Sequence, residues 1–307
     1  MIATLTALLA LSLLPSGTGR TEIRTSPASI DCAVPEGWTE VATRRPRFVV
    51  FGETHGTEQA PAFVGDVACA LATKGERILL AIEQSSTDNA ALQEAWRLPA
   101  DRFAQQLRTI GWAGRQDGVA SRAMFALLVR LHGLKEQGLP IDIAAFNNVR
   151  DDAQRARFAH LPAQGPHEAA QAENIRDAAA ASKYDRVLVL VGSLHARKQT
   201  VGQGADRFEP MVMHLARAEP TVSLEMRYAA GSIWNCMLKP GTELKPGQPI
   251  SRDALACGGH PVSGDRDLNH RPFVRLGSFP GAPDAGTYDG FFWLGPVSGS
   301  APLQAEK

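Results

Sequence analysis

The sequence predicts an α/β protein with a mainly parallel sheet, helices on both of its faces and a turn-rich C-terminal extension that contains some strand. Three observations support this. Short apolar segments alternate with helical patterns over the first 228 residues. These segments are apolar throughout, as in strands covered on both faces. Residues 229–307 hold 12 of the 28 Gly and 9 of the 20 Pro, which indicates turns.

Each element is predicted from its local pattern. Buried strands are expected at residues 47–52, 78–82, 141–146 and 186–191, with extended chain at 221–228 and near 291–294. Helices are expected at 57–74, 87–96, 119–137, 167–182 and 211–217. Thr57 can cap the first helix, and Pro61 is tolerated in its first turn. The third helix is indicated by apolar residues at helical spacing, namely Met124, Leu127, Leu128, Leu131 and Leu134.

Length and composition limit the possible organisation and partners. At ~150 residues per domain, 307 residues allow one large or two small domains. We expect one α/β domain over residues 40–228, with 229–307 packed on it. Lys and Arg total 32, as do Asp and Glu, so the chain lacks the positive charge typical of a nucleic-acid binder. Apolar residues make up 44%, which excludes a wholly disordered chain.

The N-terminus resembles an export signal. Residues 2–14 form an uncharged apolar run of 13 residues, followed by Pro15 and Gly17. This run is too short to span a bilayer but fits the apolar part of a signal peptide, although no Lys or Arg precedes it. We predict a signal peptide over residues 1–22, a periplasmic or secreted protein, and no membrane span after its removal. A buried N-terminal helix is the alternative.

Export would allow the cysteines to pair. Cys236 and Cys257 are the favoured pair because they lie close together in the turn-rich tail, where a disulfide would add ~3 kcal/mol of stability. Cys69 lies in an apolar helical pattern and is expected to be a buried thiol. Four cysteines permit three pairings, so the remaining partner choices stay open.

Polar residues with catalytic potential follow three of the four buried strands. The first strand leads into Gly52-Glu53-Thr54-His55, the second into Glu83, and the fourth into Gly192-Ser193-Leu194-His195. The third ends in Asn147 and Asn148. Because ligands bind at the carboxyl ends of strands in open parallel sheets, Glu53, His55, Glu83 and His195 are expected to converge there.

This set of side chains permits two kinds of chemistry. Two imidazoles and a carboxylate can hold a divalent metal ion such as Mn, Co, Zn or Fe, which would activate water. Without a metal, His55 or His195 can act as general base, oriented by Glu53 or Glu83. Taken singly, each His could be a hydrogen-bonded loop residue and each Glu a helix cap. The repeated Gly-x-x-His pattern after apolar strands favours a functional site.

These motifs resemble the superfamily that joins erythromycin esterases, ChaN-like haem-uptake proteins and the TIKI/TraB proteins. The similar segments are VVFGETHG (49–56), LLAIEQS (79–85), QAENIRDAAAAS (171–182) and VLVLVGSLHARK (187–198). The resemblance covers residues 47–200, and the spacing of the first motif is closer to the ChaN-like branch.

The resemblance implies an α/β fold with catalytic or metal-binding roles for Glu53, His55, Glu83 and His195. Looser candidates lie in the polar helix: Glu173, Asn174, Arg176 and Asp177. The expected activity is metal-dependent hydrolysis of an ester or amide bond in a small molecule or peptide. The alternative is an iron- or haem-binding uptake protein, which would need an axial ligand such as Tyr or His. Tyr184, Tyr228 and Tyr288 are the only tyrosines, and none lies beside a motif in the sequence, which favours the hydrolase.

Other histidines and motifs are given no catalytic role. His132 is expected to be partly exposed on its helix, His214 to be packed, and His260 and His270 to lie in loops. The sequence has neither a phosphate-binding P-loop nor a Gly-x-Ser-x-Gly nucleophile motif. Oligomeric state is left open.

Overall fold

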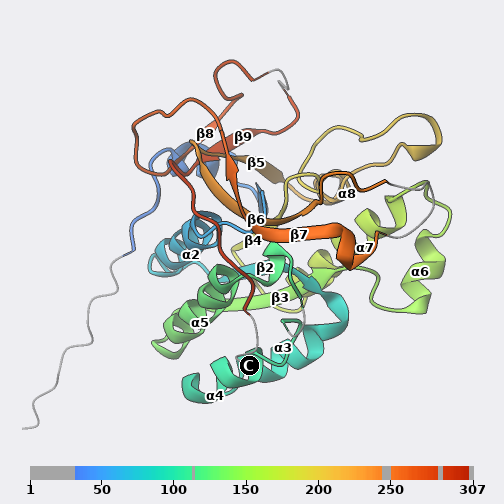
Figure 1. The fold of residues 1–307 in the computed structure, drawn as a ribbon. Helices are drawn as coiled ribbons and strands as arrows, with labels where there is room; N and C mark the ends of the chain where they lie inside the picture. Colours follow the sequence, from blue (N-terminus) through green and yellow to red (C-terminus); the bar gives the residue numbers. More distant parts are fainter. Residues whose placement is uncertain (1–31, 113–114, 244–249, 283–285, 304–307) are drawn as a thin grey trace, which may run out of the picture. The chain divides into compact units, whose positions relative to one another are not determined.

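The predicted parallel sheet is the centre of the fold. A computed structural model describes residues 32–112, 115–243, 250–282 and 286–303, so the predicted signal peptide lies outside the described residues. Within them, seven strands form one sheet in the order β3-β2-β4-β1-β5-β9-β8 (Figure 1). Their bounds are β1 Phe48–Glu53, β2 Ile78–Ser85, β3 Ile141–Asn147, β4 Arg186–Gly192, β5 Thr221–Arg227, β8 Phe273–Leu276 and β9 Gly290–Trp293.

The four predicted core strands lie side by side. β4 pairs in parallel with β1 and β2, and β2 pairs in parallel with β3. β5 extends the parallel part beyond β1, and only the edge strand β8 runs antiparallel to its neighbour. The mainly parallel α/β fold is therefore confirmed. The carboxyl ends of β2, β4 and β1 meet along one edge of the sheet.

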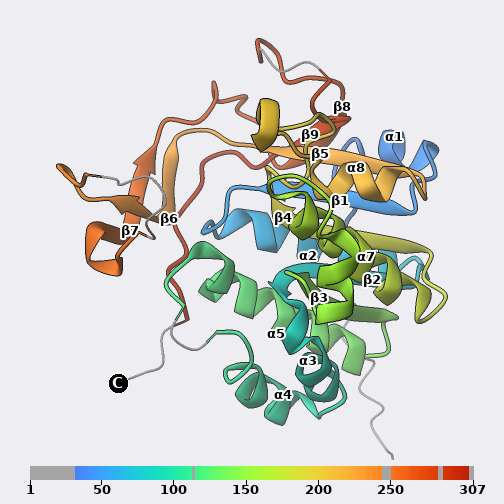
Figure 2. The same cartoon turned by 90° about the vertical axis from the view of Figure 1, so that its right-hand side faces the viewer.

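Helices cover both faces of the sheet, as expected (Figures 1 and 2). On one face, α7 and α8 pack against alternate residues of the core strands, including Val50, Val189 and Val191. α2 and α5 pack together on the opposite face, where Phe63 of α2 contacts Phe51 of β1. The bounds are α1 Trp38–Thr43, α2 Gln59–Ala72, α3 Asn89–Trp96, α4 Ala100–Leu107, α5 Arg122–Glu136, α6 Asp152–Phe158, α7 Gly165–Ala180 and α8 Met211–Ala216.

The C-terminal extension has more strand than the sequence predicts. β9 confirms the strand expected near 291–294 and pairs with β5, and β8 adds the edge strand. A separate two-stranded hairpin is formed by β6 (Gly231–Leu238) and β7 (Leu255–Val262). Since β6 follows β5 after three residues, the hairpin projects from the carboxyl edge of the sheet (Figure 2).

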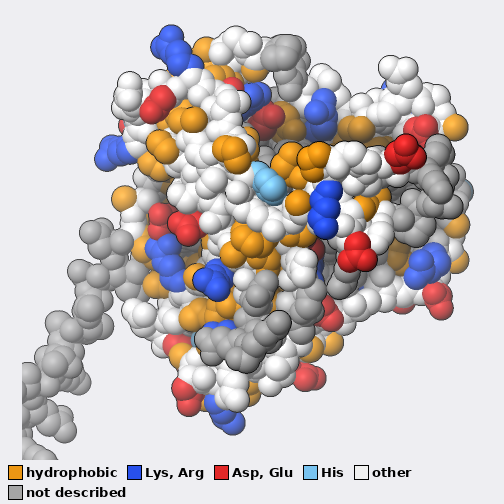
Figure 3. Space-filling model, viewed as in Figure 1, with side chains coloured by type: hydrophobic (Ala, Val, Ile, Leu, Met, Phe, Trp, Pro, Cys, Tyr) orange, Lys and Arg blue, Asp and Glu red, His pale blue; other side chains and the backbone are white. Residues whose placement is uncertain are grey.

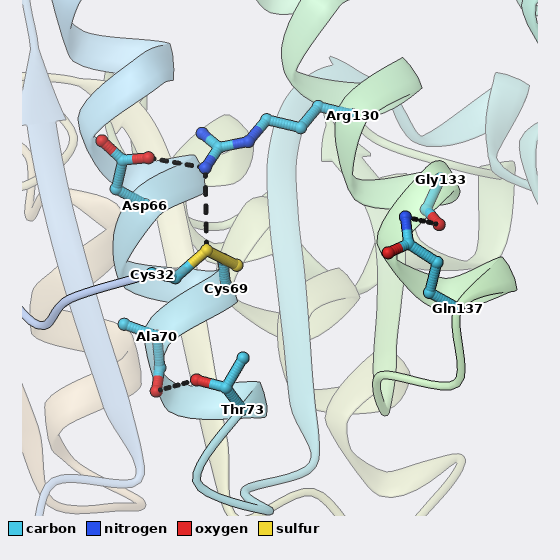
Figure 4. The surroundings of a disulfide bond; sticks show 8 residues. All are labelled: Cys32, Asp66, Cys69, Ala70, Thr73, Arg130, Gly133 and Gln137. Carbon is cyan, nitrogen blue, oxygen red and sulfur yellow. Dashed lines mark hydrogen bonds and ion pairs between the residues drawn. A yellow bond between two sulfur atoms is a disulfide. The ribbon is translucent and has the colours of Figure 1, made fainter. Parts of the chain in front are cut away.

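Both pairs of cysteines form disulfides. Cys236 and Cys257 are joined as predicted, at directly opposed positions of β6 and β7. The expectation of a free thiol at Cys69 is wrong, because Cys69 is joined to Cys32 (Figure 4). The buried, apolar setting of Cys69 on α2 is compatible with either state, so the helical pattern alone did not distinguish them. The Cys32–Cys69 bond ties the start of the described chain to α2.

The surface is mixed in charge. On the face shown in Figure 3, Lys and Arg side chains are interspersed with Asp and Glu and with hydrophobic groups.

Among the described residues, none of the helices has the length and apolar character needed to cross a membrane.

His132 of α5 is fully buried, so the expectation of partial exposure is wrong. Its ring stacks on Phe103 of α4 at 4.1 Å between centroids and meets the edge of Trp96 of α3. Helix α4 was not predicted, and it covers the face of α5 that would otherwise expose His132. Burial, with the nearby charge of Lys135, lowers the pKa of His132.

This lowered pKa predicts an acid-sensitive contribution to stability. Above pH ~6.5, His132 is neutral in the folded and unfolded states, and no effect is expected. Below that pH the unfolded chain binds a proton that the folded protein resists, so the free energy of unfolding decreases. Urea unfolding at pH 7.5 and 5.0 should show a smaller loss for His132→Phe than for the natural chain. Equal losses in the two proteins would contradict the assignment.

Candidate functional site

The structure brings together all four side chains singled out from the sequence. Glu53 ends β1 and lies opposite Gly192, the last residue of β4, in the parallel register. Glu83 lies on β2, the other neighbour of β4. His55 and His195 follow within three residues of the ends of β1 and β4. The strand order therefore places residues from three separate sequence segments at one point of the carboxyl edge.

Glu83 lies between the two imidazoles. Its Oε2 is 3.2 Å from Nε2 of His55, and its Oε1 is 3.7 Å from Nε2 of His195. The backbone N–H of Gly192 donates a hydrogen bond of 2.7 Å to Oε2. A Cβ at Gly192 would lie 2.8 Å from Nε2 of His55, so a side chain there would displace the His55 ring.

Each imidazole is also held by a second carboxylate. Nδ1 of His55 donates to Oε1 of Glu53 at 2.9 Å. Nδ1 of His195 lies 2.8 Å from both oxygens of Glu168. The site is therefore a continuous chain of alternating acids and imidazoles in the order Glu53, His55, Glu83, His195 and Glu168.

Burial and neighbouring charge act in opposite directions on these groups. Burial lowers the pKa of His55, but the Glu83 charge and the hydrogen bonds to Glu53 and Glu83 outweigh it and raise the pKa well above 6.5. Burial raises the pKa of Glu83, yet the charge of His55 and its other partners lower it to about 2. For His195, the contacts with Glu168 and Glu83 outweigh burial, and its pKa is raised.

Glu168 is a site residue that the sequence analysis missed. Its side chain is completely buried in the first turn of α7, where Oε2 accepts the N–H of Met211 at 2.8 Å. An acid in a first helical turn is common, because it interacts favourably with the helix dipole. The position of Glu168 in the sequence therefore did not indicate a role in the site. A difference between the two motifs could have indicated that such an acid exists. The first carries Glu53 beside its histidine, whereas the second carries Ser193, so its acid had to come from elsewhere.

His167 is the second residue that was missed. Its ring centroid is 5.7 Å from that of His195. Among the described residues, His167, Glu168 and His195 offer ligand atoms that lie within 4.8 Å of one another and could hold a metal ion. This group shares only His195 with the set predicted from the sequence. Burial lowers the pKa of His167.

The C-terminal extension holds the first motif in place. The carbonyl of Gly56, next to His55, accepts N–H groups from Trp234 of the hairpin and from Ser300. Trp234 and Cys236 also contact the carbonyl of Gln116, whose loop packs on the same motif at Gly118. The disulfide-linked hairpin thus contacts the segment that carries His55.

The same extension also contacts the second motif. The Tyr288 hydroxyl donates to the carbonyl of Ser193 at 3.0 Å, and Lys198 is held by Thr287 and Asp289. The side chain of Tyr228 lies beside Thr54 of the first motif. No tyrosine lies beside a motif in the sequence, but chain folding brings two of them there from distant positions.

The looser candidates on α7 belong to a different network. The Glu173 carboxylate pairs with Arg150 and Arg157, and Asn174 donates to the carbonyls of Phe146 and Asn148. Arg176 donates to the carbonyl of His214, and Asp177 pairs with Arg150. These contacts fasten α6, α8 and the end of β3 to α7. None of these contacts involves one of the five residues of the acid–imidazole chain.

Comparisons with known proteins place the fold. No family model and no curated protein sequence matches the chain. Among solved structures, a succinoglycan biosynthesis protein matches with a TM-score of 0.56 at 9% identity, over 86% of this chain and 92% of that chain. A variant of the erythromycin esterase EreC in its open conformation matches with a TM-score of 0.51 at 12% identity, over 87% and 94%.

The haem-binding ChaN of Campylobacter jejuni is a more distant match, with a TM-score of 0.40 at 12% identity over 62% of this chain and 85% of that chain. At these identities a likeness shows the fold alone. The chain accordingly has the α/β fold seen in the succinoglycan biosynthesis protein and in the erythromycin esterase.

The packing of the hairpin on Gly56 predicts a large cost for a side chain there. Gly56 has φ +87°, and a Cβ would lie 2.0 Å from the Trp234 carbonyl oxygen. Gly56→Ala should lower the free energy of unfolding by about 2–4 kcal/mol, through backbone strain and the clash. Gly75 is a matched control, since it has φ +88° and open space around it. Gly75→Ala should cost only ~1–2 kcal/mol. Equal losses in urea unfolding would show that the hairpin contact is not tight.

Proposed function

We propose that the protein hydrolyses an ester or amide bond, with His195 as the general base. The observation that carries this proposal is the asymmetry of the His195 ring. Nδ1 is held by the buried Glu168, whereas Nε2 makes no hydrogen bond within the described residues and lies 3.7 Å from Glu83. A carboxylate on Nδ1 keeps the proton on that nitrogen and leaves the lone pair of Nε2 free to accept another.

The reaction that fits this geometry begins with a water molecule at Nε2 of His195. Nε2 takes a proton from the water as its oxygen bonds to the substrate carbonyl carbon. The bond to the leaving alcohol or amine then breaks, and the proton on Nε2 passes to that group. Such general acid–base help is worth ~10²–10⁴ in rate, which suits an ester better than an amide.

His55 and Glu53, at the other end of the acid–imidazole chain, supply charge and hold Glu83 in position. Both nitrogens of His55 face carboxylates, so His55 is held as a cation between Glu53 and Glu83. This cation offsets the charge of Glu83 and fixes that carboxylate beside His195. Glu83 then stabilises the imidazolium that His195 becomes during the reaction.

A metal-bound form of the site is the alternative to the general-base form within this proposal, and the donor chemistry fits a divalent ion. Two imidazoles and a carboxylate suit Mn, Co, Zn or Fe, and histidine ligands commonly have their second nitrogen bound by a carboxylate, as Glu53 and Glu168 do here. Buried Oε2 of Glu53 also has no partner among the described residues. In that form His55, His195, Glu83 and Glu53 would hold the ion, with His55 neutral and Nε2 of His195 a ligand instead of a base. The ion would lower the pKa of water and polarise the carbonyl.

The protein's compartment is inferred from its cysteines. Two disulfides are typical of oxidising compartments, which supports export to the periplasm or outside the cell. The fold likeness to an erythromycin esterase supports a small-molecule ester as substrate, and a peptide is the alternative. The even charge balance supports neither nucleic acid nor a strongly charged partner.

Iron or haem binding is the second candidate. The observation that favours it is the position of Tyr288 against the second motif, because tyrosine is a known axial ligand of haem. The hydroxyl of Tyr288 already donates to Ser193, and hydrolysis remains the better-supported proposal.

A substrate screen distinguishes these functions. Purified protein should hydrolyse members of a panel of small esters, with a peptide panel alongside, and His195→Ala should lose at least ~10²-fold in kcat/KM with little change in Tm. His270→Ala, on an exposed residue, is the control. Metal analysis and an absorbance spectrum are recorded on the same samples. A haem band without turnover, or equal turnover in His195→Ala, would refute the hydrolase.

Glu168 should matter through the orientation of His195. Glu168→Gln keeps the shape but removes the charge that holds Nδ1–H, so kcat should fall by ~10²–10⁴ while KM changes little. Glu168→Asp, which keeps the charge, should recover part of the loss. A fall in stability with unchanged kcat would instead assign Glu168 to the attachment of α8 through Met211.

A further inference from the structure

The end of β3, which looked unremarkable in the sequence, is connected to the site by a short relay of amides. Oδ1 of Asn147 accepts the backbone N–H of Asn148 at 2.8 Å and Nε2 of Gln171 at 2.9 Å. The same Nε2 of Gln171 lies 2.7 Å from Nε2 of His167. Gln171 is completely buried, one helical turn after His167 on α7.

This relay determines which nitrogen of His167 carries the proton. The backbone N–H of Asn148 can only donate, so the Asn147 atom facing it must be the oxygen. That oxygen in turn requires the NH₂ group of Gln171, which then presents its second N–H to His167. Nε2 of His167 must therefore accept, and the proton of this neutral imidazole is on Nδ1.

The proton on Nδ1 is available to a ligand. Within the described residues Nδ1 of His167 has no hydrogen-bond partner, yet it is not among the buried unpaired atoms. It is thus open to solvent, on a ring tilted by 50° against that of His195 at 5.7 Å between centroids. The ring that carries this donor therefore lies next to the ring of His195, which is assigned as general base.

We propose that His167 binds the carbonyl oxygen of the substrate through its Nδ1–H and stabilises the negative charge that develops there. This inference rests on the proposed hydrolysis and adds a third imidazole with a distinct role. A neutral imidazole held by a hydrogen bond on its other nitrogen is an effective donor to a developing oxyanion. His167 neither gains nor loses a proton in this role, so the hydrolysis steps described above stay balanced.

The same tautomer bears on metal binding. A metal ligand needs a nitrogen lone pair. In His167 the Nε2 lone pair accepts from Gln171, and Nδ1 carries a proton. Although its spacing from Glu168 and His195 could accommodate an ion, His167 is therefore expected to contribute nothing to metal affinity.

Two substitutions at the same position test the donor role. The side-chain amide of His167→Asn places an N–H close to where Nδ1–H lies, whereas His167→Ala removes it. We expect kcat to fall by ~10²–10³ in His167→Ala, as on removal of one oxyanion donor, and to recover most of the loss in His167→Asn. His160→Ala and His160→Asn, on an exposed histidine, are the matched controls. Equal activity of His167→Ala and the natural chain would overturn the proposal.

Two further measurements do not depend on turnover, so they separate this inference from the proposed hydrolysis. Nitrogen-15 NMR of the imidazoles should show His167 protonated at Nδ1, and Gln171→Glu, which replaces the donor with an acceptor, should move the proton to Nε2. Zn²⁺ affinity by calorimetry should be the same in His167→Ala and the natural chain. Protonation of His167 at Nε2 in the natural chain, or a tenfold or greater loss of Zn²⁺ affinity, would overturn the assignment even if no substrate were found.

Discussion

The buried negative charge of Glu83 is the constraint on which the site depends. A carboxylate at the end of a central parallel strand is costly unless charge and hydrogen bonds compensate for it. Here the N–H of Gly192 and the cation of His55 supply that compensation. His55 in turn needs Glu53, and His195 needs Glu168, so one charge determines the position of four other side chains. This explains why the chain of acids and imidazoles is continuous rather than a loose cluster.

The role of the C-terminal extension can be understood from the same constraint, because it holds the loops that carry the site residues. The motif histidines lie in loops that follow the strands, and loops are mobile unless other parts of the protein hold them. Tyr288 and Thr287 hold the turn after β4, while Trp234 and Ser300 hold the turn after β1. The hairpin that supplies Trp234 has only two strands, which alone is marginally stable in water, and its disulfide compensates for that. The described parts of residues 229–303 therefore support both motifs.

Much of this arrangement was predictable because it is local. Continuous apolar runs identified the four core strands, and their parallel order placed Glu53, His55, Glu83 and His195 at one edge. What escaped prediction depends on contacts between distant segments. Cys69 meets Cys32, His132 is covered by α4, and Tyr288 reaches Ser193, and none of these contacts leaves a periodic pattern in the sequence. Glu168 was hidden by being an ordinary helix-start acid, although Ser193 in the second motif indicated that an acid was missing.

The two Gly-x-x-His motifs look equivalent in sequence, yet the structure makes them unequal. In the first, Glu53 and Glu83 take both nitrogens of His55, which removes its capacity to accept a proton. In the second, Glu168 takes one nitrogen of His195, and the other lies 3.7 Å from Glu83 without a hydrogen bond among the described residues. A repeated motif thus gives one histidine that organises charge and one that can move a proton. The difference arises at Glu83, which lies 3.2 Å from Nε2 of His55 but 3.7 Å from Nε2 of His195.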